Sequence, residues 1–269
     1  MKWRRSLRRG SCERGRGRML TAWQAWRSAV AFLTRVPVGS SAIDANAQSW
    51  APACFPLVGL ALGAVTYAAL GLARPLGAPA AATLATALAV WLTGAFHEDG
   101  LADSADGLLG AVSRERALEI MKDSRIGTYG AAALSLVLML RVALLSALGA
   151  MTALACLMSV SLARVGPVWL MTHLNHAAPN QSKNKDLTSV PRSRAYCATL
   201  LMLAASAVML TAVPSAATRI GAAWLIEAIV ILYVGRLARR RLGGITGDLL
   251  GASEQLGEVT ILMVFAAHV

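Results

Sequence analysis

Four of the chain's 14 acidic residues lie within eleven positions, in the stretch HEDGLADSADG at 97–107. If this stretch is helical, Asp99, Asp103 and Asp106 fall within about 60° of one another around the helix axis. Like charges on one helix face repel one another, and a bound divalent cation would remove that cost. Carboxylate oxygens are hard ligands of the kind that Mg²⁺ and Mn²⁺ prefer. We therefore predict that these three aspartates hold a divalent cation, Mg²⁺ or Mn²⁺, in preference to forming a solvated acidic helix end.

A second group of carboxylates lies near the C-terminus, in the glycine-rich stretch GGITGDLLGASEQLGE at 243–258. Glu254 and Glu258 are four residues apart and would share one face of a helix. Asp248 stands just before them. We predict that Asp248, Glu254 and Glu258 complete the metal site or form a second one. Spacing alone does not tell which carboxylate binds metal and which takes a proton.

Basic side chains beside glycines and hydroxyls suit phosphate oxygens. The stretch KDSRIGTYG at 122–130 supplies Lys122 and Arg125 just before an apolar run. Taken alone, this stretch fits a basic anchor at the lipid headgroups equally well. Arg141 and Arg164 lie within apolar runs, where an ionisable side chain is costly and marks a functional site by default, although snorkelling to the headgroups is the alternative. We predict that Arg164 reaches a phosphate at the mouth of the bundle.

The composition indicates a chain solvated largely by lipid. Of its 269 residues, 56% are hydrophobic and only 15% are charged, with a mean hydropathy of +0.55, whereas soluble domains carry about 25% charged residues. A net charge of +12 could indicate nucleic-acid binding. However, 22 of the 26 Lys and Arg lie before residue 51 or in three polar stretches between apolar runs. That distribution is typical of basic loops in a membrane protein, and we expect no nucleic-acid partner.

The apolar runs predict an all-α fold, because a transmembrane helix needs about 20 apolar residues. We expect a polytopic integral membrane protein with about six to seven transmembrane helices in hairpins. An interfacial helix at 20–36 would precede them, since Gln24 and Arg27 interrupt its apolar spacing. Residues 1–19 are Arg-rich and are expected to be a disordered extension, with 20–269 forming a single transmembrane catalytic domain. The predicted spans are 54–73 with 79–97, 127–149 with 151–171, 196–214 with 219–235, and a short final run at 257–269.

Three longer polar stretches separate the hairpins, at 98–126, 172–195 and 236–256. Cytoplasmic loops carry an excess of Lys and Arg, so we expect the N-terminus and all three stretches to face the cytoplasm. Nearly every polar group that could do chemistry would then meet at one membrane face.

Five stretches resemble the cobalamin synthase family, formally the adenosylcobinamide-GDP ribazoletransferases. They run in the family's order and cover most of the chain from residue 30 onward. The family pattern commonly reads His-x-Asp-Gly-Leu-Ala-Asp, and this chain has Glu98 at the variable place. The stretch 174–190 matches the family least well. The matching stretches are FLTRVPVG (32–39), FPLVGLALG (55–63), HEDGLADSADGLLG (97–110), MKDSRIGTYG (121–130) and GGITGDLLGASEQLGE (243–258).

The resemblance implies a Mg²⁺-dependent enzyme of the bacterial inner membrane that acts late in cobalamin biosynthesis. Such an enzyme joins adenosylcobinamide-GDP to α-ribazole, or to its 5′-phosphate, and releases GMP; the product is adenosylcobalamin or its phosphate. On this interpretation, Asp103 or Asp123 would orient or deprotonate the ribazole 5′-hydroxyl. The sequence leaves open a homo-oligomer and association with other enzymes of the pathway. The side chains expected to contact substrate or its phosphates are His97, Lys122, Arg125 and Arg164.

Two other functions are weighed against this one. CDP-alcohol phosphatidyltransferases also place spaced aspartates at a membrane face, but their signature has an Arg where this chain has Asp103, and their later pair of aspartates is absent here. A transporter could be built from the three hairpins, but the carboxylates gather at one predicted face rather than at the middle of the membrane. Release of GMP, of CMP, or of neither would separate the three.

Overall fold

The computed structural model describes residues 20–39, 44–110, 113–178 and 190–267. Within those ranges every regular element is a helix, which confirms the all-α class. Six helical segments are long and apolar enough to cross a membrane, and a seventh is added if one bent pair counts as a span. The segments are Ala45–Leu76, Thr128–Ala147, Thr152–His173, Arg192–Ala212, Pro214–Leu242 and Gly247–Ala266, and the bent pair is Ala78–Thr93 with Phe96–Gly110.

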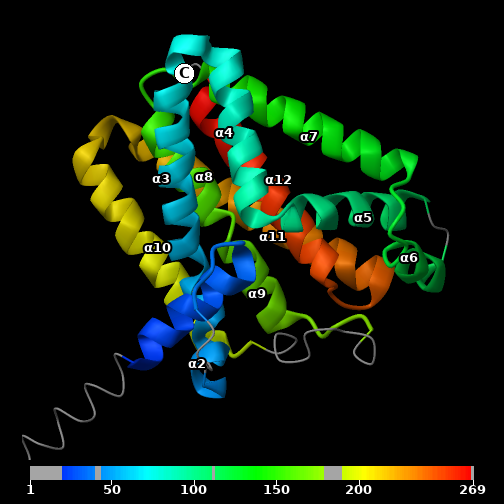
Figure 1. The fold of residues 1–269 in the computed structure, drawn as a ribbon. Helices are drawn as coiled ribbons and strands as arrows, with labels where there is room; N and C mark the ends of the chain where they lie inside the picture. The colour runs from blue at the N-terminus through cyan, green and yellow to red at the C-terminus, as the bar shows by residue number, and fades with distance from the viewer. Residues whose placement is uncertain (1–19, 40–43, 111–112, 179–189, 268–269) are drawn as a thin grey trace, which may run out of the picture.

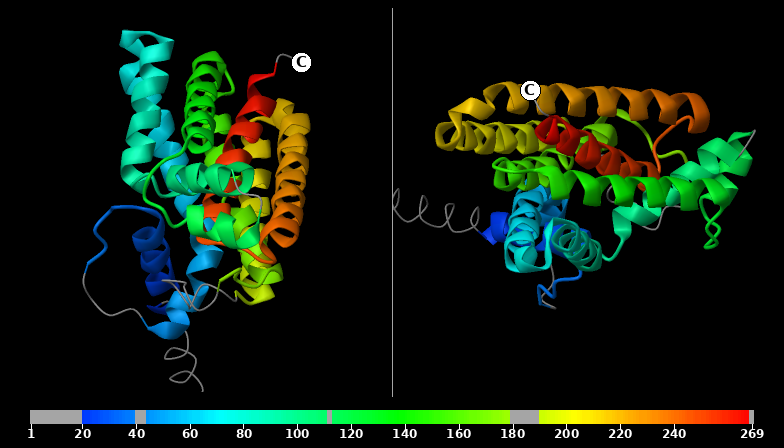
Figure 2. Two further views of the ribbon diagram at one scale, coloured as in Figure 1. Left: turned by 90° about the vertical axis from the view of Figure 1, so that its right-hand side faces the viewer. Right: turned by 90° about the horizontal axis from the view of Figure 1, so that it is seen from above.

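Helix α12 (Gly247–Ala266) is the centre of the bundle, where it packs against five other helices (Figure 1). Helices α3 (Phe55–Ala73) and α4 (Ala78–Thr93) form the first hairpin. From above, this cyan hairpin is seen nearly end on, while the green, orange and red helices run across the view (Figure 2). The partners of α12 are α5 (Phe96–Gly110), α7 (Thr128–Ala147), α8 (Thr152–Leu162), α9 (Val165–His173) and α11 (Ala217–Leu242).

The predicted single span at 79–97 is wrong, because the helix ends at Thr93 and α5 leaves it at an angle of 89°. Two successive residues adopt left-handed backbone angles at the break: Gly94 with φ of 71° and Ala95 with φ of 58°. Glycine adopts such angles at little cost and so favours a helix end. The bend carries the acidic stretch across the bundle and against α12 instead of into a loop.

The predicted polar loop at 236–256 is also wrong over most of its length. Helix α11 continues to Leu242, and α12 begins at Gly247. Gly243, with φ of 68°, ends the first helix, and the Thr246 hydroxyl caps the second by accepting a hydrogen bond from the N–H of Leu249. The predicted short final run is therefore the second half of a helix of 20 residues. Its polar side chains point into the bundle, which the sequence pattern does not distinguish from a solvated loop.

The helix predicted at 20–36 forms over residues 20–33. It buries Ala25, Ala29 and Leu33 while Leu20 and Trp23 are exposed, as expected of an amphipathic helix. Its position on a membrane surface remains a prediction, and the extension predicted at 1–19 lies outside the described residues.

The three polar segments meet, as predicted from their shared basic character. The guanidinium of Arg114, on α6 (Arg114–Ile120), donates hydrogen bonds to the carbonyls of Leu242 and Ala177, at 2.7 and 2.8 Å. A parallel bridge joins His176 to Ile245. These contacts connect the segment after α5, the segment after α9 and the turn before α12 at one end of the bundle.

Candidate active site

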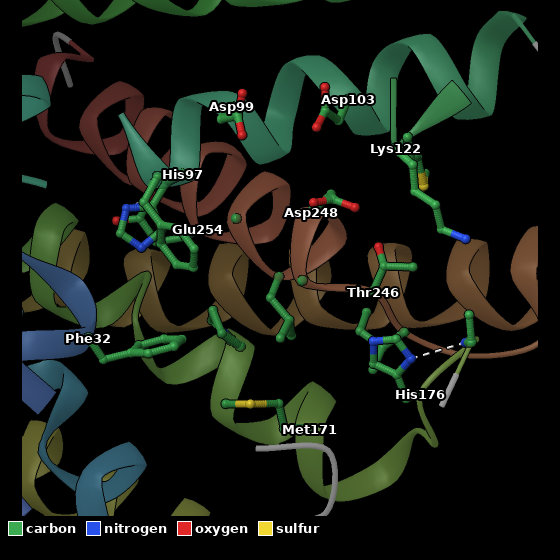
Figure 3. A pocket seen from close by; sticks show the side chains of 18 of the residues that line it. Phe32, His97, Asp99, Asp103, Lys122, Met171, His176, Thr246, Asp248 and Glu254 are labelled. Atoms are coloured by element: carbon green, nitrogen blue, oxygen red, sulfur yellow. Dashed lines mark hydrogen bonds and ion pairs between the residues drawn. The ribbon is translucent and has the colours of Figure 1, made fainter. Parts of the chain in front are cut away.

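A cavity of about 920 Å³ lies where these three segments meet α9 and the helix at 20–33. Figure 3 shows Phe32 and His97 at one end of it, and Lys122, Thr246 and His176 at the other. Most of the sequence-predicted site residues line this one space. The lining includes His97, Asp99, Asp103, Lys122, Asp123, Arg164, Asp248 and Glu254.

Three carboxylates face the cavity from two helices. Asp99 and Asp103 project from α5 toward Asp248, which lies in the first turn of α12 (Figure 3). A close approach of the two helices brings them together: a Cβ added at Gly100 would lie 2.7 Å from the carbonyl oxygen of Asp248. Gly100 therefore sets the distance between the two acidic segments, because a side chain there would meet backbone.

We expect Gly100→Ala to lower both turnover and affinity for a divalent cation, by about tenfold or more, since overpacking of this kind typically costs about 1–3 kcal/mol. The measurement is product formation across a Mg²⁺ titration, with helix content checked by circular dichroism. Gly110→Ala on the same helix is the matched control, because its Cβ would meet only the Tyr129 ring, at 3.7 Å. Equal losses in the two variants would contradict the role given to Gly100.

Asp106 is separated from the other aspartates of α5. Its two carboxylate oxygens accept hydrogen bonds from the backbone N–H groups of Gly127 and Gly130, at 2.7 and 2.8 Å. A helix rises about 1.5 Å per residue, so Asp106 lies about 10 Å beyond Asp99 along the axis even though the two share a face. It does not line the cavity, and it fastens the start of α7 to α5. In the structure, both carboxylate oxygens of this predicted metal ligand are therefore engaged by backbone N–H groups.

Glu254 and Glu258 are held by buried arginines. The guanidinium of Arg164 lies 2.7 Å from a carboxylate oxygen of Glu254, and Arg141 forms an ion pair with Glu258 and lies 3.7 Å from Glu98. Each of these side chains is at most 5% exposed. An ion pair with Arg already offsets the charge of Glu254 and of Glu258, so neither carboxylate needs a metal ion for that purpose. The two intramembrane arginines are inside the bundle rather than snorkelling to its surface.

Only part of the stretch after α6 lines the cavity. Lys122 and Asp123 line it, but the Arg125 side chain is 87% exposed and lies outside its lining. Arg125 forms an ion pair with Asp123 at 2.6 Å, and its hydrogen bonds lower the pKa of Asp123 to about 2. A carboxylate with so low a pKa is a weak base, so Asp123 is a poor choice for accepting a proton from a hydroxyl.

Three aromatic rings wall one end of the cavity, and the sequence analysis did not single them out as a group. Phe32 stacks on Phe55 with a centroid distance of 5.6 Å and meets Phe96 edge to face at 5.4 Å. They come from three separate elements, so no spacing pattern joins them. The cavity therefore has an aromatic end and, beyond the carboxylates, a basic end.

Two further residues were missed. His176 lines the basic end, and a lone histidine in a polar loop gives no signal of this. Glu227 is 2% exposed within α11, and neither of its carboxylate oxygens has a hydrogen-bond partner in the described part of the chain. An acidic residue inside an apolar run was visible in the sequence and should have been singled out, as Arg141 was.

The carboxylates that line the cavity fit Mg²⁺ only together with ligands from a bound substrate. Across the described ranges, no three His, Cys, Asp or Glu side chains are grouped so that they could hold a metal ion by themselves. Mg²⁺ in phosphoryl-transfer sites keeps several waters and takes only one or two carboxylates, with substrate phosphates supplying the rest. Asp99 and Asp248, which line the cavity from two adjacent helices, would supply the carboxylates for binding of that kind.

Comparison with known proteins gives one consistent result. Residues 25–266 match the family model described as cobalamin-5-phosphate synthase. A relative from Azorhizobium caulinodans named adenosylcobinamide-GDP ribazoletransferase is 40% identical over 88% of this chain and 92% of its own. Relatives of the same name from Bradyrhizobium diazoefficiens and Escherichia coli are 42% and 36% identical, over 90% and 87% of this chain and 92% and 96% of their own. No solved structure matches the chain. The chain belongs to the cobalamin-5-phosphate synthase family.

Proposed function

We propose that the chain joins adenosylcobinamide-GDP to α-ribazole or its 5′-phosphate, forms adenosylcobalamin or its phosphate, and releases GMP. The observation that supports this most is the cavity in which Asp99, Asp103 and Asp248 lie between an aromatic end and a basic end. The aromatic end suits the planar base of α-ribazole, and the basic end suits a nucleotide pyrophosphate. The family membership supports the same reaction.

In the proposed reaction, a ribose hydroxyl oxygen of the acceptor attacks the phosphorus that carries the corrinoid, and the bond to the GMP oxygen breaks. This hydroxyl must be free in both α-ribazole and its 5′-phosphate, so it is not the 5′-hydroxyl expected from the sequence, which the 5′-phosphate blocks. Asp103 accepts the hydroxyl proton, because Asp123 is committed to Arg125. Lys122 pairs with phosphate oxygens, and Arg164 reaches the cavity beside His97. Asp99 and Asp248 would hold Mg²⁺, which when bound would offset the pyrophosphate charge and stabilise the leaving GMP.

Release of GMP by purified full-length protein in liposomes tests this function. We expect release only when both substrates and Mg²⁺ are present, and none when EDTA is in excess. CDP-diacylglycerol with an alcohol acceptor is the control substrate pair. CMP release from that pair, or an absence of GMP release without an ion gradient, would instead favour the phosphatidyltransferase or the transporter.

We further propose that the protein lies in the bacterial inner membrane with the cavity open to the cytoplasm. Support comes from the basic residues, which gather in the segments that form the cavity mouth. The test places a cysteine at Glu115 on α6 in one variant and at Arg74, in the turn between α3 and α4, in another, and treats intact cells with a membrane-impermeant maleimide. We expect labelling at the second position only, and the reverse pattern would contradict the orientation.

His176 is expected to donate a hydrogen bond to a substrate phosphate. Its Nδ1 accepts a hydrogen bond from the N–H of Ala178 at 3.0 Å, and burial lowers its pKa. The ring is therefore neutral at pH 7 with its proton on Nε2. Glutamine places an amide N–H near the position of Nε2, whereas asparagine resembles Nδ1. We expect His176→Gln to keep most of kcat/KM and His176→Asn to lose about tenfold, mainly through KM. Equal losses in the two variants would show that Nε2 has no such role.

A further inference from the structure

A second cavity, of about 590 Å³, lies between α9 and α11 and is separate from the first. The two cavities use different faces of α9: Pro167 and Met171 line the first, whereas Trp169 and Leu170 line the second. The second cavity is called the lateral groove below. The remaining lining residues on the two helices are Val165, His173, Leu174, Trp224, Glu227, Ala228, Ile231, Leu232, Gly235, Arg236 and Arg239.

The lateral groove is lined mainly by apolar side chains, with Glu227 and His173 as polar exceptions, and it is basic at one end. The indole N–H groups of Trp169 and Trp224 donate to hydroxyls of α10 (Arg192–Ala212), those of Thr199 at 2.9 Å and Ser206 at 3.2 Å. Both indoles are thereby fixed, and their carbon surfaces line the groove. The indole surfaces and the aliphatic side chains beside them, among which are Leu170 and Ile231, suit a hydrocarbon chain.

At the basic end of the groove, Arg236 and Arg239 border it from the last turns of α11, three residues apart. Both side chains are exposed, and neither has a hydrogen-bond or ion-pair partner among the residues that the structure describes. Unpaired guanidinium groups beside an apolar groove are complementary to a phosphate joined to a hydrocarbon chain.

The dimensions agree with a membrane lipid. From Trp224 to Arg239 the α11 wall is about 22 Å long at 1.5 Å per residue. One leaflet of a bilayer has a hydrocarbon depth of about 15 Å, which is shorter than this wall. The groove is therefore long enough to hold the acyl chain of a lipid whose phosphate lies at the arginines. Glu227 is about 18 Å from Arg239 along the helix, which keeps its carboxylate away from that phosphate.

We propose that the lateral groove binds one anionic phospholipid, with an acyl chain against Trp169 and Trp224 and the phosphate between Arg236 and Arg239. This lipid is held specifically, unlike those that solvate the bundle at large. The proposal is independent of the reaction proposed for the first cavity, because the two sites share no side chain.

Native mass spectrometry of the purified full chain, titrated with phosphatidylglycerol and with phosphatidylcholine, tests the proposal. We expect one phosphatidylglycerol to be retained more tightly than phosphatidylcholine, and Arg239→Gln to weaken it about tenfold. Arg240→Gln is the matched control, since this neighbouring arginine loses the same charge but does not border the groove. Ala228→Phe fills the groove without changing charge and should also expel the lipid.

Each outcome decides the matter. Equal weakening by Arg239→Gln and Arg240→Gln would show diffuse electrostatic attraction instead of a site. Unchanged lipid retention in Ala228→Phe, or displacement by free inorganic phosphate, would show that the groove does not hold the acyl chain. Size-exclusion profiles and GMP release check that the variants are folded. We expect GMP release to be unchanged in folded variants, because none of these residues lines the first cavity.

Discussion

Asp103→Asn is expected to lower the rate of GMP release at saturating Mg²⁺ by a hundredfold or more, while the Mg²⁺ concentration for half-maximal activity stays near that of the unaltered protein. The reason is that the amide cannot accept the hydroxyl proton, and general-base catalysis contributes about 10²–10⁴-fold. Asp248→Asn should act differently: removing one of the two proposed ligands should raise the required Mg²⁺ more than tenfold. Titrating Mg²⁺ against initial rates measures both effects.

The contrast between these two variants separates proton transfer from metal binding. Glu115→Gln is the control, because Glu115 is an exposed acid on α6 that does not line the cavity. Near-normal turnover in Asp103→Asn would remove this residue from the mechanism. A raised Mg²⁺ requirement in that variant would instead make Asp103 a ligand, as the sequence alone suggested.

Arg141→Met is expected to destabilise the protein more than any other single change considered above. It leaves Glu258, and Glu98 at 3.7 Å, buried in a bundle without their cation. Breaking a buried ion pair in this way costs about 3–5 kcal/mol, whereas replacing both partners with apolar side chains is often neutral. The double variant Arg141→Met with Glu258→Leu should therefore recover most of the lost thermal stability in detergent.

This cycle uses Arg141 and Glu258 because neither lines the first cavity, so stability is measured apart from substrate binding. Glu98 keeps a hydrogen bond from the Gln255 amide at 3.2 Å in the double variant. If the double variant is no more stable than Arg141→Met alone, Arg141 stabilises the bundle through packing, and the ion pair is not the reason for its burial.

The hydrophobic pattern was sufficient to predict the class of fold, and the basic residues between the apolar runs were sufficient to predict that the polar segments meet. An apolar run of about 20 residues has the length of a membrane-spanning helix, and α3, α7 and α10 begin and end close to the predicted residues. The pattern failed at α12, where Glu254 and Glu258 gave the appearance of a polar loop. Sequence cannot show that Arg141 and Arg164, about 100 residues away on other helices, neutralise them.

The acidic stretch shows a similar limit. Its helical spacing correctly grouped Asp99 and Asp103, but Asp106 was assigned with them because an angular criterion ignores distance along the axis. The bend at Gly94 and Ala95 and the contact at Gly100 decide where this helix lies. The aromatic wall and His176 depend wholly on that tertiary arrangement, so local pattern carries no trace of them.

Density for a divalent cation is the most direct test of the account, in a structure of the full chain determined with Mn²⁺ and a non-hydrolysable analogue of the nucleotide pyrophosphate substrate. We expect one ion or more between Asp99 and Asp248, completed by pyrophosphate oxygens, with Lys122 on the same phosphates and Glu254 still paired with Arg164. A pyrophosphate bound elsewhere, or an ion held by Glu254 and Glu258 with the arginines displaced, would contradict it.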